Sequence, residues 1–97
     1  MNPGEYLASV VEVKSTRTLS GELATEVVFW ADEGIISALF SQTIPFHMDK
    51  LLSLKIAAGL NKSHLNSELI GKSCRIKVIL EKRHKPARLR VSGYTAV

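Results

Sequence analysis

The sequence predicts a mainly β protein of one domain, residues 1–97, with five strands and one helix between the third and the fourth strand. Five short segments rich in β-branched, aliphatic and aromatic residues are separated by polar turn residues, whereas one segment has helical spacing. A length of 97 residues suffices for one small core. A hydrophobic fraction of 45% with 23% charged residues is typical of a folded chain and excludes intrinsic disorder.

Three strands are expected in the first half of the chain. The first covers Tyr6 to Lys14, where both alternating sets of side chains are largely apolar, and a polar loop follows it. The second covers Glu22 to Ala31 and the third Ile35 to Ser41. Between them we interpret Asp32-Glu33-Gly34 as the three-residue loop of a hairpin, with the glycine in a left-handed conformation.

A helix is expected from Phe46 to Ala58. Pro45 suits the start of a helix, because its missing N–H would have no partner there, and Gly59 suits the left-handed cap beyond the end. Apolar residues fall on one broad arc of this helix, which Lys55 interrupts. We expect the alkyl stem of Lys55 to lie along the core edge while its ammonium group stays in water.

The last part of the chain predicts two more strands. A polar connector leads to a fourth strand from Lys72 to Lys82, the basic turn Arg83-His84-Lys85-Pro86 follows, and a fifth strand covers Ala87 to Tyr94. Three strands, a helix and two strands is the order of the OB-fold, a five-stranded, partly open barrel. An SH3-like or other small barrel shares much of this pattern, but a helix before the fourth strand favours the OB-fold.

Charge is distributed unevenly along the chain. Residues 1–71 carry five bases and eight acids, a net charge of −3, whereas residues 72–97 carry eight bases and one acid, a net charge of +7. Such asymmetry creates a local positive field that attracts polyanions such as nucleic acids. The other interpretation of these bases is a solvated pair of strands whose lysines and arginines serve solubility.

The expected hairpin register decides which face of the second and third strands meets solvent. A three-residue loop pairs Trp30 with Ile36 and Glu26 with Phe40. Because only the face with Glu26 holds a charge, we assign that face to solvent, which exposes Trp30 and Phe40 on the strands where OB-folds commonly bind nucleic acid. Taken alone, Trp30 is more often a packing residue or dimer contact, and Phe40 more often a core residue.

Bases alternate with apolar residues in the fourth and fifth strands, so they point together away from the core. The basic turn between these strands and the loop that contains Arg17 flank the binding groove of an OB-fold. Aromatic rings beside a basic groove allow bases to stack and phosphates to be neutralised. We expect Trp30 and the C-terminal arginines to share one groove. The predicted nucleic-acid-binding residues are Tyr6, Arg17, Trp30, Phe40, Arg75, Lys77, Lys82, Arg83, Lys85, Arg88, Arg90 and Tyr94.

Several short motifs resemble those of a family of small phage-encoded proteins regarded as OB-fold single-stranded DNA-binding proteins. The similar segment runs from Leu51 to Val78 and includes Ala57-Ala58-Gly59 at the helix end and Glu68-Leu69-Ile70-Gly71-Lys72 at the end of the connector. A late Gly93-Tyr94 and the opening Pro3-Gly4-Glu5-Tyr6 are also similar. The resemblance implies a non-enzymatic accessory of DNA replication, recombination or repair in the cytoplasm of a host cell.

The sequence contains no motif for catalysis. The three histidines lack metal-ligand spacing, the glycines form no phosphate-binding loop, and the single cysteine, Cys74, cannot form a disulfide within the chain. No signal peptide or membrane-spanning run is present, so we expect a cytoplasmic protein. We therefore expect no enzyme, cofactor, metal or small-molecule substrate. The partners that we predict are single-stranded DNA, or RNA, and a second copy in a homodimer; the alternative is a protein-interaction module without a nucleic-acid role.

Overall fold

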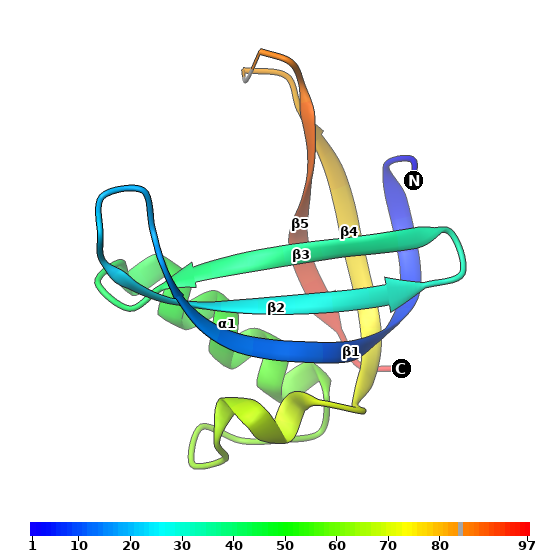
Figure 1. The fold of residues 1–97 in the computed structure, drawn as a ribbon. Helices are drawn as coiled ribbons and strands as arrows, with labels where there is room; N and C mark the ends of the chain where they lie inside the picture. The colour runs from blue at the N-terminus through cyan, green and yellow to red at the C-terminus, as the bar shows by residue number, and fades with distance from the viewer. Residues whose placement is uncertain (84) are drawn as a thin grey trace.

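The computed structural model describes residues 1–83 and 85–97, so His84 of the expected basic turn lies outside the described residues. The expected mainly β architecture, five strands with one helix between the third and fourth, is confirmed (Figure 1). Only β1 is clearly longer than expected. The elements in chain order are β1 (Gly4–Arg17), β2 (Leu23–Ala31), β3 (Gly34–Ser41), α1 (Pro45–Ala57), the 3-10 helix η1 (Asn66–Leu69), β4 (Ser73–Glu81) and β5 (Arg88–Thr95).

The five strands form one antiparallel sheet in the order β3-β2-β1-β4-β5. β1 lies at the centre because it is long enough to pair twice, through residues 4–9 with β4 and through residues 9–17 with β2. The register shifts between Val10 and Glu12, which leaves Val11 as a bulge, and bulges bend a strand. Figure 1 accordingly shows β2 and β3 crossing β4 and β5 at a steep angle.

The core fills the inside of this bend. Phe29 of β2, Leu54 of α1, Leu69 of η1 and Ile76 of β4 are all fully buried, because alternate residues of each strand and one face of the helix are apolar. Tyr94 connects the two ends of the sheet, since its ring lies 5.8 Å from that of Phe29 and 6.3 Å from that of Phe40 of β3. The strands β3 and β5, which are last on either side of the sheet, therefore share one core.

The register expected for the β2–β3 hairpin is wrong by one residue. The loop has two residues, Asp32 and Glu33, and Gly34 pairs directly with Ala31 at a φ of 146°. Trp30 consequently pairs with Ile35 instead of Ile36. A shift of one residue turns every side chain of a strand to the other face. The faces expected for β3 are therefore exchanged, whereas those of most of β2 are as expected.

This exchange corrects the placement of one predicted binding residue. Phe40, expected on the solvent face, is only 3% exposed and belongs to the core, while its neighbour Leu39, expected in the core, is 46% exposed. Trp30 is 50% exposed, as expected. The Asp-Glu-Gly segment is compatible with loops of either two or three residues, and only the packing of β3 against the core selects the shorter loop.

Helix α1 begins at Pro45 and ends at Ala57, and Gly59 follows it with a φ of 84°. The start and the glycine cap agree with the sequence pattern. The expectation that the Lys55 ammonium lies in water is wrong: the residue is 9% exposed, and its Nζ donates a hydrogen bond of 2.9 Å to the carbonyl oxygen of His64. Among the described helices, none has the length and apolar character needed to cross a membrane.

Candidate nucleic-acid interface

A pocket of about 560 Å³ opens between β3, the first turns of α1 and the β4–β5 hairpin. We call it the basic pocket. It exists because β3 and β5 converge at Tyr94 without pairing along their length, so that one edge of each strand faces the same space. Its lining residues are Ser37, Ala38, Leu39, Phe40, His47, Lys50, Glu81, Arg83, Arg88, Leu89, Arg90, Val91 and Tyr94.

The charge of the basic pocket is mostly positive. Four cationic side chains line it, namely Lys50, Arg83, Arg88 and Arg90, against one carboxylate, Glu81. Arg90 Nε donates a hydrogen bond of 2.6 Å to Glu81 Oε2, and Arg83 Nη2 lies 3.8 Å from the same oxygen. Glu81 is buried, so it holds the Arg90 guanidinium in a defined orientation while leaving the pocket an excess of positive charge.

Helix α1 supplies two lining residues that the sequence analysis missed. Lys50 Nζ donates a hydrogen bond of 2.8 Å to the carbonyl oxygen of Ser92 and also lies 5.5 Å from the centre of the Phe46 ring. His47 Nδ1 accepts a 2.9 Å hydrogen bond from the backbone N–H of Ser41, which leaves Nε2 as the nitrogen that carries the proton. The available signal was their spacing of three residues, which places both on one helix face.

The inner wall of the basic pocket is aromatic and aliphatic. Phe40 and Tyr94 contact each other there, beside Leu89 and Val91. Burial raises the pKa of the Tyr94 phenol, so this ring is neutral near neutral pH. Because Phe40 is nearly inaccessible, it can form a wall but offers no free ring face for stacking.

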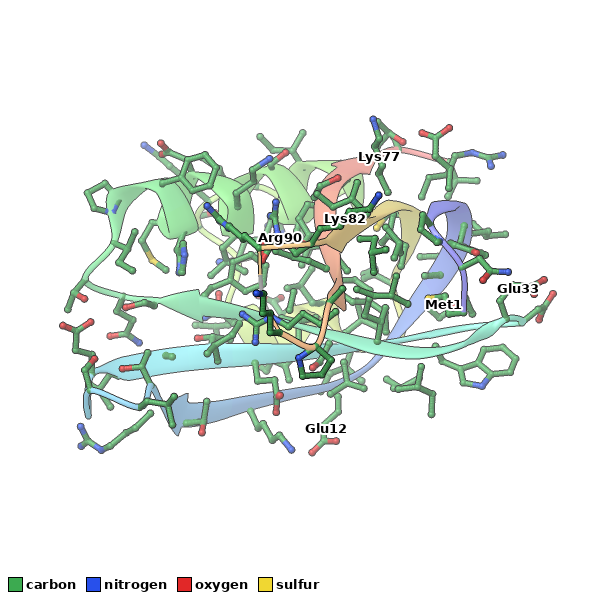
Figure 2. The ribbon with its side chains drawn as sticks, turned by 90° about the horizontal axis from the view of Figure 1, so that it is seen from above. Met1, Glu12, Glu33, Lys77, Lys82 and Arg90 are labelled. Carbon is green, nitrogen blue, oxygen red and sulfur yellow. The ribbon has the colours of Figure 1, made fainter. Side chains whose placement is uncertain are left out.

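Five of the twelve predicted binding residues line the basic pocket. They are Phe40, Arg83, Arg88, Arg90 and Tyr94. Lys82 and Lys85 are exposed in the adjoining β4–β5 turn. Figure 2 shows Lys82 and Arg90 close together in projection, where the β4–β5 hairpin rises toward the viewer. The structure therefore gathers most of the predicted bases of the hairpin around one opening.

Trp30 is not among the residues that line this pocket. It pairs with Ser9 on one side and Ile35 on the other, next to the hairpin turn that holds Glu33. In Figure 2, Glu33 lies at the right-hand end of the molecule, whereas Arg90 and Lys82 lie near its middle. The expectation that Trp30 and the arginines of the β4–β5 hairpin share one groove is therefore wrong, because all are exposed but Trp30 does not line the pocket that the arginines line.

The remaining predicted residues lie elsewhere. Arg75 and Lys77 are exposed on β4, where they pair with Leu7 and Glu5 of β1. Arg17 ends β1, and its Nη1 donates a hydrogen bond of 2.8 Å to the Gly21 carbonyl oxygen across the β1–β2 loop. Tyr6, the last of the predicted aromatic binding residues, is half-buried and donates its hydroxyl proton to the backbone carbonyl oxygen of Asn2. None of these four lines the basic pocket.

The described residues offer little for covalent or metal chemistry. Cys74 is buried on the core side of β4, and this burial raises the pKa of its thiol to about 11, so the thiol is protonated and inert near neutral pH. Within residues 1–83 and 85–97, no three histidine, cysteine or acidic side chains come together as metal ligands would. No protein-family model and no curated protein sequence matches the chain.

Proposed function

We propose that this chain is an OB-fold protein that binds single-stranded DNA without catalysing a reaction, as an accessory of DNA replication or recombination. The observation that carries the proposal is the basic pocket, in which four cations from α1 and the β4–β5 hairpin surround an apolar wall. The strand order and the position of α1 agree with an OB barrel that is open between β3 and β5.

In this proposal the phosphates of the strand meet the cations at the rim of the pocket. Arg83 and Arg88 lie at the base of the β4–β5 turn, Arg90 is oriented by Glu81, and Lys50 approaches from the helix. Guanidinium groups suit this role because their planar fork matches two phosphate oxygens. Neutralising about four phosphates of a single strand gives a slope of log K against log salt near −3.

The β4–β5 turn extends the positive surface beyond the pocket. Figure 1 shows this turn projecting away from the rest of the fold. Lys82 and Lys85 are exposed on it, so both can follow the backbone of a strand that leaves the pocket. Because these contacts go to phosphates and not to base edges, binding is expected to tolerate many sequences.

A direct test compares two double variants that each remove two positive charges, one in the basic pocket and one on β4. Fluorescence anisotropy with labelled oligo-dT is measured for the wild type, for R83Q/R88Q in the basic pocket and for R75Q/K77Q on β4. We expect R83Q/R88Q to weaken binding at least about tenfold and to reduce the salt slope by about 1.4, since two phosphate contacts are lost. R75Q/K77Q should change binding much less.

Three outcomes would reject the proposal or move its site. No binding by the wild type at low salt would reject a nucleic-acid role altogether. Equal losses in both double variants would show a diffuse attraction without a defined pocket, and a larger loss in R75Q/K77Q would move the interface to the outer face of β4. Competition by unlabelled oligo-U of the same length measures the preference for DNA over RNA.

A second candidate function is a homodimer or protein-binding surface, because another exposed patch is apolar. Leu7 of β1, Trp30 of β2 and Ile35 of β3 are each at least half exposed, and none lines the basic pocket. Exposed aromatic and aliphatic residues gathered on one surface favour protein contacts. Sedimentation of the wild type and W30A tests this: a dimer in the wild type that becomes a monomer in W30A supports the interface, and a monomeric wild type argues against a homodimer.

A further inference from the structure

A second pocket, also of about 560 Å³, lies between α1, the chain around the start of β2 and the end of β3, and η1. It shares no lining residue with the basic pocket. We call it the Lys55 pocket. Part of its wall is apolar, from Met48, Leu51 and Leu52. The other lining residues are polar or charged, namely Thr25, Gln42, Asp49, Lys55, Lys62 and Asn66.

Lys55 is the unusual member of this pocket. It is 9% exposed on a helix that otherwise turns apolar residues toward the core. Its Nζ donates a hydrogen bond to the His64 carbonyl oxygen, but no carboxylate of the described residues lies within 4.0 Å of it. A buried charge is costly unless it is paired, and an ammonium group has three protons to donate. A carbonyl oxygen satisfies one donor and leaves the charge without a counter-ion.

Thr25 of β2 is a second buried polar residue that lines the Lys55 pocket. Its side chain is 4% exposed, and its Oγ1 accepts a hydrogen bond from Asn66 Nδ2 at 3.4 Å, which is long for such a bond. The other buried polar side chains of the described chain have closer partners: Ser41 bonds to Thr43 at 3.1 Å, and Glu81 to Arg90 at 2.6 Å. Lys55 carries a charge without a counter-ion and Thr25 has only a long hydrogen bond, and both residues line the same pocket. Such groups together indicate a site for a polar ligand.

We propose that the Lys55 pocket binds a small organic anion through a carboxylate or phosphate group placed against Lys55. Lys62 adds a second cation at the pocket, and Asp49 is the one acid among the lining residues, so the lining carries a net positive charge. Thr25 and Asn66 supply further hydrogen-bonding groups, and Met48 with its leucine neighbours accommodates the carbon part of the ligand. The inference does not depend on nucleic-acid binding, since the two pockets share no residue.

Amide NMR titration with inorganic phosphate, and separately with acetate, tests the proposal at constant ionic strength set with chloride. We expect saturable shifts at the amides of Thr25, Lys55 and Asn66. K55M keeps the length of the side chain and removes the charge, so it should weaken anion binding at least about tenfold. D49N should strengthen binding because it removes a repulsive charge. The matched control K72Q, which removes an exposed charge outside both pockets, should leave binding unchanged.

The anion that shifts the amide signals identifies the chemical class of the ligand. Shifts with phosphate alone assign the ligand to phosphate esters, and shifts with acetate alone assign it to carboxylates. Shifts confined to Arg88 and Arg90, unsaturable shifts, or full binding by K55M would overturn the proposal. If K55M does not fold by circular dichroism, K62Q replaces it, and an unchanged affinity in both K62Q and D49N would equally overturn it.

Discussion

Replacing Phe40 with alanine tests the hairpin register on which the placement of the whole β3 strand depends. Phe40 is 3% exposed and packs beside Tyr94, whereas Leu39 is 46% exposed on the opposite face. Removing a buried phenylalanine side chain leaves a cavity and costs about 3 to 5 kcal/mol. Removing a leucine that is only about half buried costs about 1 kcal/mol, which is half the value for full burial. The structure therefore predicts a difference of about 2 to 4 kcal/mol between F40A and L39A.

Urea unfolding followed by circular dichroism measures this difference. Domains of this size have a total stability of about 5 to 15 kcal/mol, so F40A should shift the midpoint strongly while the protein remains folded in buffer, and L39A should shift it only slightly. If the free energy of unfolding has the same slope against urea concentration in both variants, the difference between their unfolding midpoints reports a difference in stability. If F40A is not folded in buffer, F40L provides a milder truncation of the same side chain.

The opposite order of the two variants would refute the reasoning. A three-residue loop would place Leu39 in the core and Phe40 on the surface, so L39A would then be the more destabilising change. Equal and small effects would show that neither face of β3 is firmly packed. Because both residues lie on the same strand and are neighbours, a difference in strand propensity cannot account for a gap of several kcal/mol.

Three further predictions follow from buried or strained groups. The pKa of the Cys74 thiol is raised from 9.0 to about 11 in the folded protein, so the thiol ionises at a lower pH in the unfolded chain than in the folded one. The free energy of unfolding should therefore fall by about 2 to 3 kcal/mol as the pH rises from 9 to 11. Urea titrations at pH 8, 9, 10 and 11 will measure this fall. Tyr94 adds a loss in the same direction, and C74A should show the smaller alkaline decline. E81Q should destabilise the fold by about 1 to 2 kcal/mol, because Arg90 loses its anion, yet tighten oligo-dT binding in anisotropy because the basic pocket gains net positive charge. G59A, at a φ of 84°, should cost about 1 kcal/mol in thermal unfolding; no change would show that the end of α1 is not constrained there.

Local patterns in the sequence were sufficient to predict the order of elements. Pro45 and Gly59 mark the two ends of the helical segment, and short apolar runs between polar turns mark the strands. The inward and outward faces of most of β2 were also predictable, because Glu26 and the neighbouring Val27 differ so clearly in hydrophobicity. These features depend on residues that are close in the chain, where preferences for turns and alternation act directly.

Only the tertiary structure decided which side chains meet. Lys50 of α1 bonds to Ser92 of β5, 42 positions later, and this approach makes α1 part of the basic pocket. The register of the β2–β3 hairpin buries Phe40, the connector after α1 comes to lie against Lys55, and Trp30 stays outside the basic pocket. Local preferences cannot specify such distances, because a shift of one residue in a loop or a bulge in one strand costs little locally yet redirects every side chain that follows.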